Sequence, residues 1–108
     1  MKITRIGKKE LVIGAVANCK HLAQGKVVHP STNKEVVARD LAVWLLVVHM
    51  EMPLPEVARH FGLTSDAAGE SVMKVIHERN NSEKVAALIG RLEGIIDQFI
   101  DVIEMEAV

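Results

Sequence analysis

The sequence predicts an all-α protein, a compact bundle of about five helices that contains a helix-turn-helix and ends in a long helix. Apolar residues recur at three- and four-residue steps, and proline or glycine falls between the repeating segments. Hydrophobic residues make up 49% of the chain but only 3% are aromatic, so the core must be mainly aliphatic, which suits packed helices. The 108 residues suffice for one core, and we assign residues 1–108 to a single domain.

A first helix is expected from Lys8 to about Ala23, where apolar residues repeat with helical spacing. Gln24-Gly25 is expected to end this helix. The next segment contains His29-Pro30-Ser31, which is typical of a turn. We therefore expect the residues between the first and second helices to form a connection.

A second helix is expected from about Lys34 to Met50, with Ser31 or Asn33 as its N-cap. Its stretch from Leu41 to Val48 is apolar all round, a pattern that a surface helix does not tolerate. This helix is therefore expected either to lie at the centre of the domain or to be covered on one side by another chain.

The corner that follows has the helix-ending and helix-starting residues of a helix-turn-helix, although an ordinary helical corner has the same residues. Prolines interrupt the second helix, a short helix runs from Pro55 to Phe61, Gly62 closes it, and Thr64 or Ser65 caps the next helix. For that next helix we predict a buried stripe of Ala68 or Gly69, Val72, Met73 and Ile76, and an outward face of Glu70, Ser71, Lys74 and His77.

The last helix is expected from Glu83 to near the end of the chain, after an interruption at Asn80-Asn81-Ser82. Its apolar stripe repeats every seven residues. Such stripes most often pack on their own domain, but this one is wide enough to serve a partner helix as well. A homo-oligomer through this helix, or through Val47 and Val48, is therefore a candidate assembly. The stripe comprises Val85, Leu88, Ile89, Leu92, Ile95, Ile96, Phe99, Val102 and Ile103.

Charge is distributed unevenly along the chain, whose formal net charge is −1. Residues 1–81 carry eleven Lys and Arg against eight Asp and Glu, whereas residues 82–108 carry two against six. The acidity therefore lies at one end. This balance permits binding to nucleic acid without arguing strongly for it.

A cytoplasmic location is expected. Cys19 is the only cysteine, so no internal disulfide forms, which fits a reducing compartment. The apolar run near the start is short and is cut by Gly14, Asn18 and Lys20, so it fits neither a signal peptide nor a membrane span.

The titratable residues do not form an enzyme motif. Neighbouring helical residues such as Cys19 and His21 point in different directions, and no second pair completes a zinc site. The helical histidines His49, His60 and His77 lack ligand spacing, and no phosphate-binding glycine loop or nucleophile elbow occurs. We therefore expect no enzyme, no metal, no nucleotide and no other cofactor.

Two runs, Arg39–Leu45 and Leu54–Gly62, resemble the C-terminal DNA-binding domain of the bacterial chromosomal replication initiator DnaA. That family typically shows a basic residue followed by Ile-Ala-Met-Tyr-Leu, then Ser-Leu-Pro-Glu-Ile-Gly and a Phe-Gly ending. The correspondence continues without a gap to Ile76, and the flanking helices agree in order and length. The resemblance implies an all-helical fold related to the Trp-repressor type of helix-turn-helix, with double-stranded DNA as its partner.

The resemblance places the family's groove-reading signature, Gly-Arg-Asp-His-Thr-Thr, on Leu63 to Ala68, where most of it is absent. Ser65 keeps a hydroxyl that can donate a hydrogen bond. Asp66 puts a negative charge where the family has His, and Ala67 offers only apolar contact, for example to a thymine methyl group. The residues at the start of the recognition helix therefore differ from those that read the DNA groove in the family.

Other positions retain roles that the resemblance implies. The family's basic loop is matched by Val27–Lys34, where only Lys34 is fully cationic at neutral pH. Fewer cations mean weaker binding and a shallower dependence on salt. The implied DNA-binding set is Lys34, Arg39 and Lys74 at phosphates, Pro55 with Glu56 at the docking corner, Arg59 on the basic face, and Thr64, Ser65 and Ala67 facing bases.

Our leading expectation is duplex DNA binding with altered or weak sequence preference, in the regulation of replication initiation or transcription. The initiator's ATPase module has no counterpart in residues 1–108, so we expect a stand-alone relative with another role. The alternative is a helical protein-interaction or oligomerisation module that kept the scaffold and lost specific DNA recognition.

Overall fold

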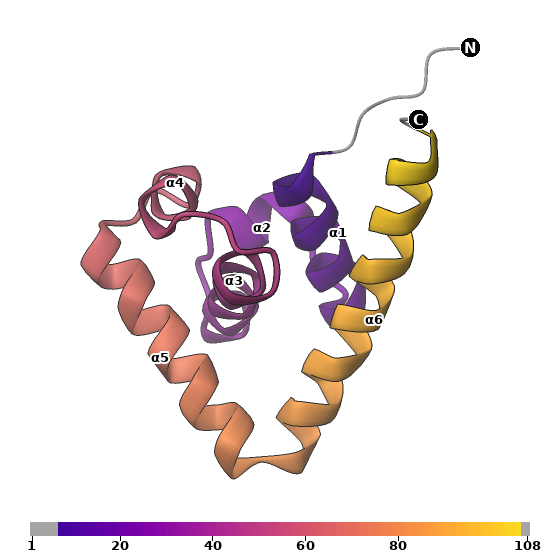
Figure 1. Cartoon of the computed structure of the whole chain (residues 1–108). Helices are drawn as coiled ribbons and strands as arrows, with labels where there is room; N and C mark the ends of the chain where they lie inside the picture. The colour runs from indigo at the N-terminus through magenta and orange to yellow at the C-terminus, as the bar shows by residue number, and fades with distance from the viewer. Residues whose placement is uncertain (1–6, 107–108) are drawn as a thin grey trace.

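A computed structural model describes the backbone of residues 7–106 and the side chains of residues 7–100. All regular structure in these residues is helical, which confirms the all-α prediction (Figure 1). The Cα radius of gyration is 13.7 Å, close to the ~13 Å of a compact domain of about 100 residues. The elements are α1 (Lys8–Lys20), α2 (Gln24–Val28), α3 (Asn33–Trp44), the π-helical segment η1 (Leu45–His49), α4 (Leu54–His60), α5 (Ser65–Asn81) and α6 (Glu83–Glu106).

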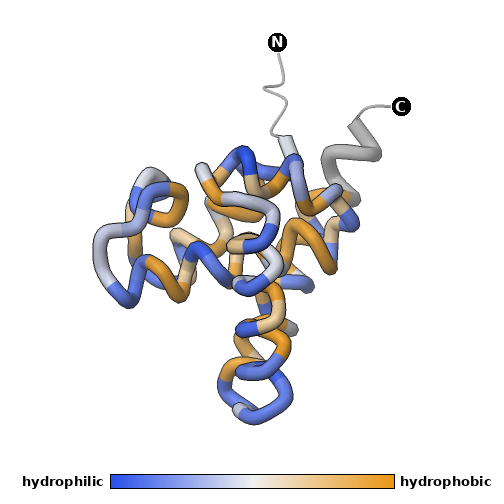
Figure 2. The backbone as a smooth tube through the Cα atoms, turned by 90° about the vertical axis from the view of Figure 1, so that its left-hand side faces the viewer, coloured by the Kyte–Doolittle hydropathy of each residue, from blue (hydrophilic) through white to orange (hydrophobic). Residues whose placement is uncertain are grey.

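Helices α5 and α6 form the two arms of a V, and α3 is seen end-on between them (Figure 1). Helix α3 contacts α5 on one side and α1 and α2 on the other, while α6 packs against α1 and α5. The junction of α5 and α6 is hydrophilic and projects from the rest of the chain (Figure 2). This arrangement encloses α3 within the bundle.

The central position of α3 explains why its second half is apolar all round. Every residue from Leu41 to Leu46 is buried, and Trp44 is only 1% exposed. Of the two expectations for this helix, the central one is confirmed. Apolar residues continue beyond the enclosed part of the helix. Val48, on the following turn, is apolar but 45% exposed.

The start of α3 is fixed by a capping box, although neither of the two expected caps forms it. Thr32 is the N-cap: its hydroxyl accepts a hydrogen bond from the Glu35 amide at 3.2 Å, and the Glu35 carboxylate accepts from the Thr32 amide at 3.2 Å. The same carboxylate accepts from the Ser31 amide at 2.8 Å. The hydrogen bond from the Ser31 amide is the main reason that the pKa of Glu35 is lowered, against the opposing effect of burial.

Further local features differ from the sequence-based expectations. Helix α1 ends at Lys20 rather than at about Ala23, and Gln24-Gly25, expected to end that helix, begins α2 instead. The segment expected to be a connection contains the short helix α2, and the last turn of the second helix is the π-helical segment η1. Helix α2 has five residues, too few for an apolar repeat to be recognised in the sequence. In η1 the Met50 amide donates to the Leu45 carbonyl, five residues back, at 2.9 Å.

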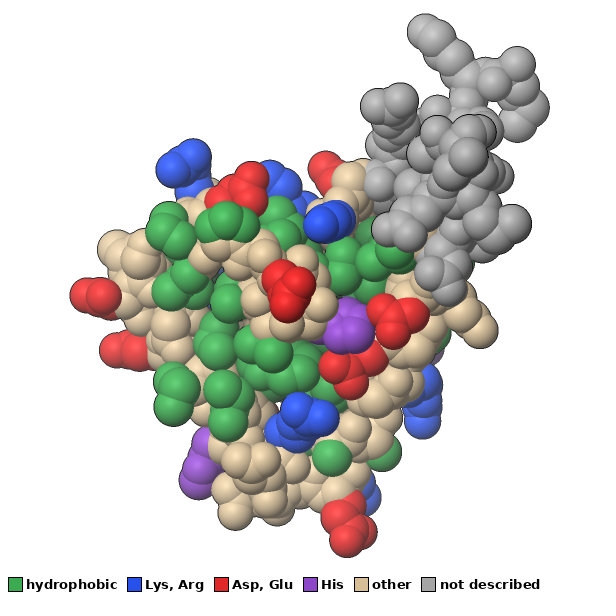
Figure 3. Space-filling view, viewed as in Figure 1, with side chains coloured by type: hydrophobic (Ala, Val, Ile, Leu, Met, Phe, Trp, Pro, Cys, Tyr) green, Lys and Arg blue, Asp and Glu red, His purple; other side chains and the backbone are tan. Residues whose placement is uncertain are grey.

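Helix α6 packs mainly on its own domain. Ile89, Leu92 and Ile96 from the expected stripe are fully buried, whereas Phe99 is 53% exposed. The side chains of Val102 and Ile103 lie outside the described part of the helix. Hydrophobic side chains also gather on the face between α5 and α6 (Figure 3). Among the described helices, none has the length and apolar character needed to cross a membrane.

Candidate nucleic-acid interface

Helices α4 and α5 meet at the corner where the sequence predicts a helix-turn-helix. Helix α4 ends in a Schellman motif: the Leu63 amide donates to the Ala58 carbonyl at 2.8 Å and the Gly62 amide to the Arg59 carbonyl at 3.2 Å. Gly62 has a φ of 67°, a left-handed conformation that glycine adopts without steric cost. The turn therefore has a defined geometry, and it directs the start of α5 away from α4.

The first turn of α5 is exposed, as a groove-reading helix requires. Thr64 is the N-cap, and its hydroxyl accepts a hydrogen bond from the Ala67 amide at 3.1 Å. Ser65 and Asp66 are exposed and Ala67 is half-buried. Of the three residues expected to face bases, Thr64 thus uses its hydroxyl oxygen within the helix cap, while the Ser65 side chain is exposed.

The buried stripe of α5 is rotated relative to the predicted one. Ala68, Ser71 and Val75 are buried, so the prediction that Ser71 faces outward is wrong. Met73 is 64% exposed, so its predicted burial is also wrong. Ser71 lies three residues after Ala68 and four before Val75, and this spacing already places it on their face. Because serine is polar, the pattern of hydrophobic residues did not assign Ser71 to the buried face.

An open hollow lies between α3 and α5, and four of the eight predicted DNA-binding residues line it. These are Arg39, Ser65, Ala67 and Lys74. The other four, Lys34, Pro55, Arg59 and Thr64, are exposed but do not line the hollow. The remaining residues of its lining are Val36, Asp40, Leu54, Asp66, Gly69, Glu70, Ser71, Met73 and His77.

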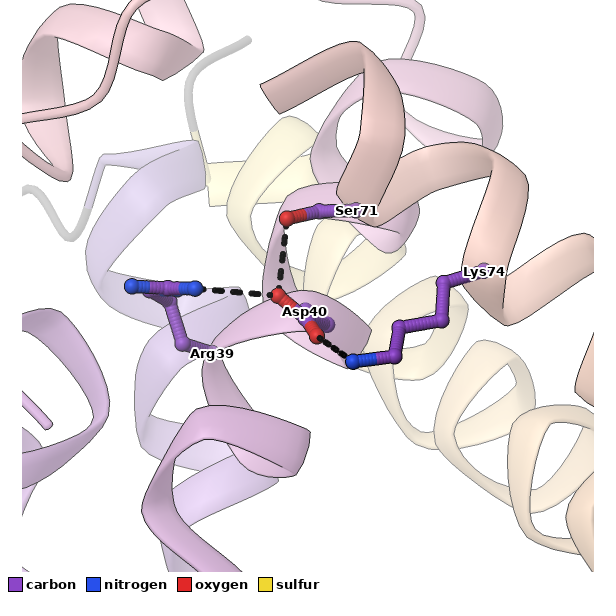
Figure 4. Close-up of polar contacts among 4 residues, drawn as sticks. All are labelled: Arg39, Asp40, Ser71 and Lys74. Atoms are coloured by element: carbon purple, nitrogen blue, oxygen red, sulfur yellow. Dashed lines mark hydrogen bonds and ion pairs between the residues drawn. The ribbon is translucent and has the colours of Figure 1, made fainter. Parts of the chain in front are cut away.

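A buried carboxylate lies in the wall of this hollow. Asp40, on α3, is 4% exposed and accepts a hydrogen bond from the Ser71 hydroxyl at 2.7 Å. Its oxygens lie 3.4 Å from the Arg39 guanidinium and 3.8 Å from the Lys74 ammonium (Figure 4). Neither Asp40 nor Ser71 was among the predicted site residues. The contacts of Asp40 with Ser71 and Lys74 join segments more than thirty residues apart, so no local pattern indicates them.

The hollow is lined by charged side chains of both signs. Arg39 and Lys74 supply two permanent cations, but Asp40, Asp66 and Glu70 line the same surface. The exposed cations Lys34 and Arg59 lie outside the hollow, with no ion pair to any described side chain. Phosphate binding here would therefore depend on a small number of cations.

A second polar cluster connects η1 to α6, away from the hollow. The two ring nitrogens of His49 lie 3.1 Å from a Glu93 carboxylate oxygen and 2.7 Å from an Asp97 oxygen. The described residues contain no group of three or more His, Cys, Asp or Glu side chains arranged to hold a metal ion. We treat this cluster as a link between two helices.

Neither protein-family models nor curated proteins give a match to this chain. The resemblance to the DnaA C-terminal domain therefore stays a prediction from the sequence, with its specific part in residues 39–62. The helical fold and the α4–α5 corner are observed.

Proposed function

We propose that the protein binds double-stranded DNA through α4 and α5, with weak or altered sequence preference. The exposed first turn of α5, beside a hollow bounded by Arg39 and Lys74, is the observation that carries this proposal. In helix-turn-helix proteins the N-terminal residues of the second helix contact base edges, and cations on neighbouring elements contact phosphates. By the similarity to the initiator domain, we place the activity in the regulation of replication initiation or transcription.

Base contacts would be few under this proposal. Ser65 offers one hydroxyl and Ala67 one methyl group, while the carboxylate of Asp66 accepts hydrogen bonds but repels phosphates. Most of the binding free energy would then come from contacts to the DNA backbone, for which Lys34, Arg39, Arg59 and Lys74 are the candidate cations. Binding should accordingly be sensitive to salt and tolerant of base sequence.

Fluorescence anisotropy of labelled duplexes tests the proposal. A random duplex and one carrying the initiator's binding box are titrated with protein at about 50 mM and about 200 mM salt, a range over which contacts to phosphates weaken markedly. We expect binding at micromolar protein in the lower salt, loss of affinity in the higher salt, and little difference between the duplexes. Absence of salt-sensitive binding at micromolar protein would overturn the proposal.

A pair of variants locates the binding surface. Lys34→Gln together with Arg59→Gln removes two exposed cations from the proposed DNA face and should weaken binding at low salt. Lys84→Gln removes an exposed cation at the start of α6, near the junction with α5. It should leave binding unchanged. Equal losses in both proteins would place the contact elsewhere.

A protein-interaction module is a second candidate, favoured by exposed apolar side chains on and near α6. Val48 is 45% exposed and Phe99 is 53% exposed. A contact surface would require these side chains to belong to a contiguous apolar patch, because apolar residues that are exposed singly are common on the surface of soluble domains. Light scattering over a range of concentrations tests self-association: a strict monomer would contradict a homo-oligomer through Val48 or the C-terminal helix.

A further inference from the structure

Asp40 is a buried acid on the surface proposed to meet phosphates. It is 4% exposed, and its only close neutral donor among the described side chains is the Ser71 hydroxyl at 2.7 Å. Two cations complete its surroundings, Arg39 at 3.4 Å and Lys74 at 3.8 Å (Figure 4). A buried carboxylate is stable only when it is paired and hydrogen-bonded, so Asp40 needs these cations.

The same two cations are the ones that line the hollow. Lys74 is well placed to reach a ligand, since its side chain is 60% exposed, whereas that of Arg39 is 21% exposed. Lys34 and Arg59 differ from them, because neither forms an ion pair with the part of the chain that the structure describes. The proposed DNA face therefore contains two kinds of cation: Arg39 and Lys74, which share the carboxylate of Asp40, and exposed cations that have no counter-ion among the described side chains.

We infer that Asp40 is an internal counter-ion that competes with DNA phosphates for Arg39 and Lys74 and thereby limits the affinity of the chain for duplex DNA. This inference rests on the proposed function. Asp40 touches no base in this account. It is a positioning residue that acts through the two cations.

A phosphate that approaches the hollow changes the surroundings of Asp40. If Lys74 turns toward a phosphate, Asp40 loses part of its neutralisation while it remains buried, and this loss opposes binding. If Lys74 stays with Asp40, the phosphate gains little from it. A cation that is already paired also displaces fewer counter-ions from DNA, so it contributes less to the salt dependence of binding.

The variant Asp40→Asn tests this inference, because asparagine can still accept the Ser71 hydrogen bond but carries no charge. We expect affinity for a random duplex at low salt to increase by roughly three- to tenfold, the effect of one unit charge within about 8 Å of a phosphate after screening. We also expect the plot of log affinity against log salt to steepen by up to about 0.9 for each cation released.

A double-mutant cycle separates competition from general charge. Lys74→Gln should cost little affinity in the native background and clearly more in the Asp40→Asn background. Asp66→Asn is the matched control, since it removes one negative charge from the same hollow without removing an ion-pair partner of Lys74. Its effect should be additive with that of Lys74→Gln. Equal coupling of Lys74 to Asp66 and to Asp40 would overturn the inference.

The outcomes distinguish this inference from the proposed function. Binding by the native chain with no gain in Asp40→Asn overturns the inference alone. Binding by Asp40→Asn but not by the native chain supports the inference and overturns the proposed function. No binding by either folded protein overturns both.

If circular dichroism shows that Asp40→Asn does not fold, the inference can be tested with single variants of the native chain, Lys34→Gln and Lys74→Gln. Lys34→Gln should then reduce both affinity and salt slope more than Lys74→Gln does. If Lys74→Gln has the larger effect on both, Asp40 does not hold Lys74 back from phosphate, and the inference fails.

Discussion

The two ends of the central helix are held in different ways. At the start of α3, Thr32 and Glu35 form a reciprocal capping box, and Ser31 adds two further hydrogen bonds to the same carboxylate. At the other end, η1 replaces the last α-helical turn and packs against α1 and α4 with Leu45 and Leu46 buried, while Glu51 follows with a φ of 55°.

This difference separates local from tertiary causes of structure. The capping box uses groups within five residues of one another, so it can form before the rest of the domain packs. A π-helical turn and a non-glycine residue in the left-handed region are unfavourable in isolation and persist where the surroundings impose them. The first end is therefore expected to depend on polar groups and the second on burial.

The largest effect is expected at the buried end. Leu46→Ala removes a fully buried side chain and should lower the free energy of unfolding by about 2–5 kcal/mol, through lost burial and the cavity left behind. Val48→Ala, two residues later and 45% exposed, should change it by less than about 1 kcal/mol. Urea denaturation measures both. Similar losses in the two variants would contradict burial as the cause.

A smaller effect is expected at the capped end. Thr32→Ala removes the hydroxyl that accepts from the Glu35 amide and should lower the free energy of unfolding by about 0.5–2 kcal/mol. Thr32→Ser keeps the hydroxyl and should retain most of the stability. If both variants lose the same stability, the hydrogen bond is not responsible and the methyl group of Thr32 must be.

The charge of Glu35 makes the capped end dependent on pH. Because the pKa of Glu35 is lowered in the folded state, its ionised form stabilises the fold at neutral pH. That contribution is present above the ordinary glutamate value of 4.5 and is lost as the pH falls through the lowered value. Glu35→Gln should therefore be less stable than the native chain at pH 7, and the difference should shrink in acid. Thermal denaturation across this range measures it, and a constant difference would argue against the charge.

The smallest effect, and the only gain in stability, is expected just after η1. Glu51 is exposed and has a φ of 55°. Glu51→Gly should raise the free energy of unfolding by up to about 1 kcal/mol, because glycine adopts this conformation without a steric penalty. His21, the C-cap of α1, has a φ of 56° and provides a second position for the same test. Destabilisation at both positions would show that their side chains contribute more than the backbone strain costs.

Much of the helix order was predictable because helix ends are marked locally. The starts at Lys8 and Glu83 and the closure at Gly62 follow from apolar spacing, polar interruptions and a single glycine. The five-residue α2 was missed, since so short a helix has no apolar repeat. The choice of Thr32 as cap was missed although a sequence signal exists: Thr32 has Glu35 three residues later, the capping-box pattern, which neither Ser31 nor Asn33 has. Four predicted site residues meet in one hollow, but the acid that pairs with two of them was not predicted.

The sequence by itself determined the class of fold and the positions at which the helices around Gly62 begin and end, because these depend on residues close together in the chain. For the apolar helix it left two alternatives, a central position or cover by another chain, and the packing decided for the central position. Tertiary structure alone decided what the polar residues of α5 meet. Helical spacing already places Ser71 on the buried face, but its hydrogen-bond partner there is Asp40, thirty-one residues away. Contacts across such a separation depend on how whole helices pack, and a helical repeat in one segment carries no information about the partner it will face.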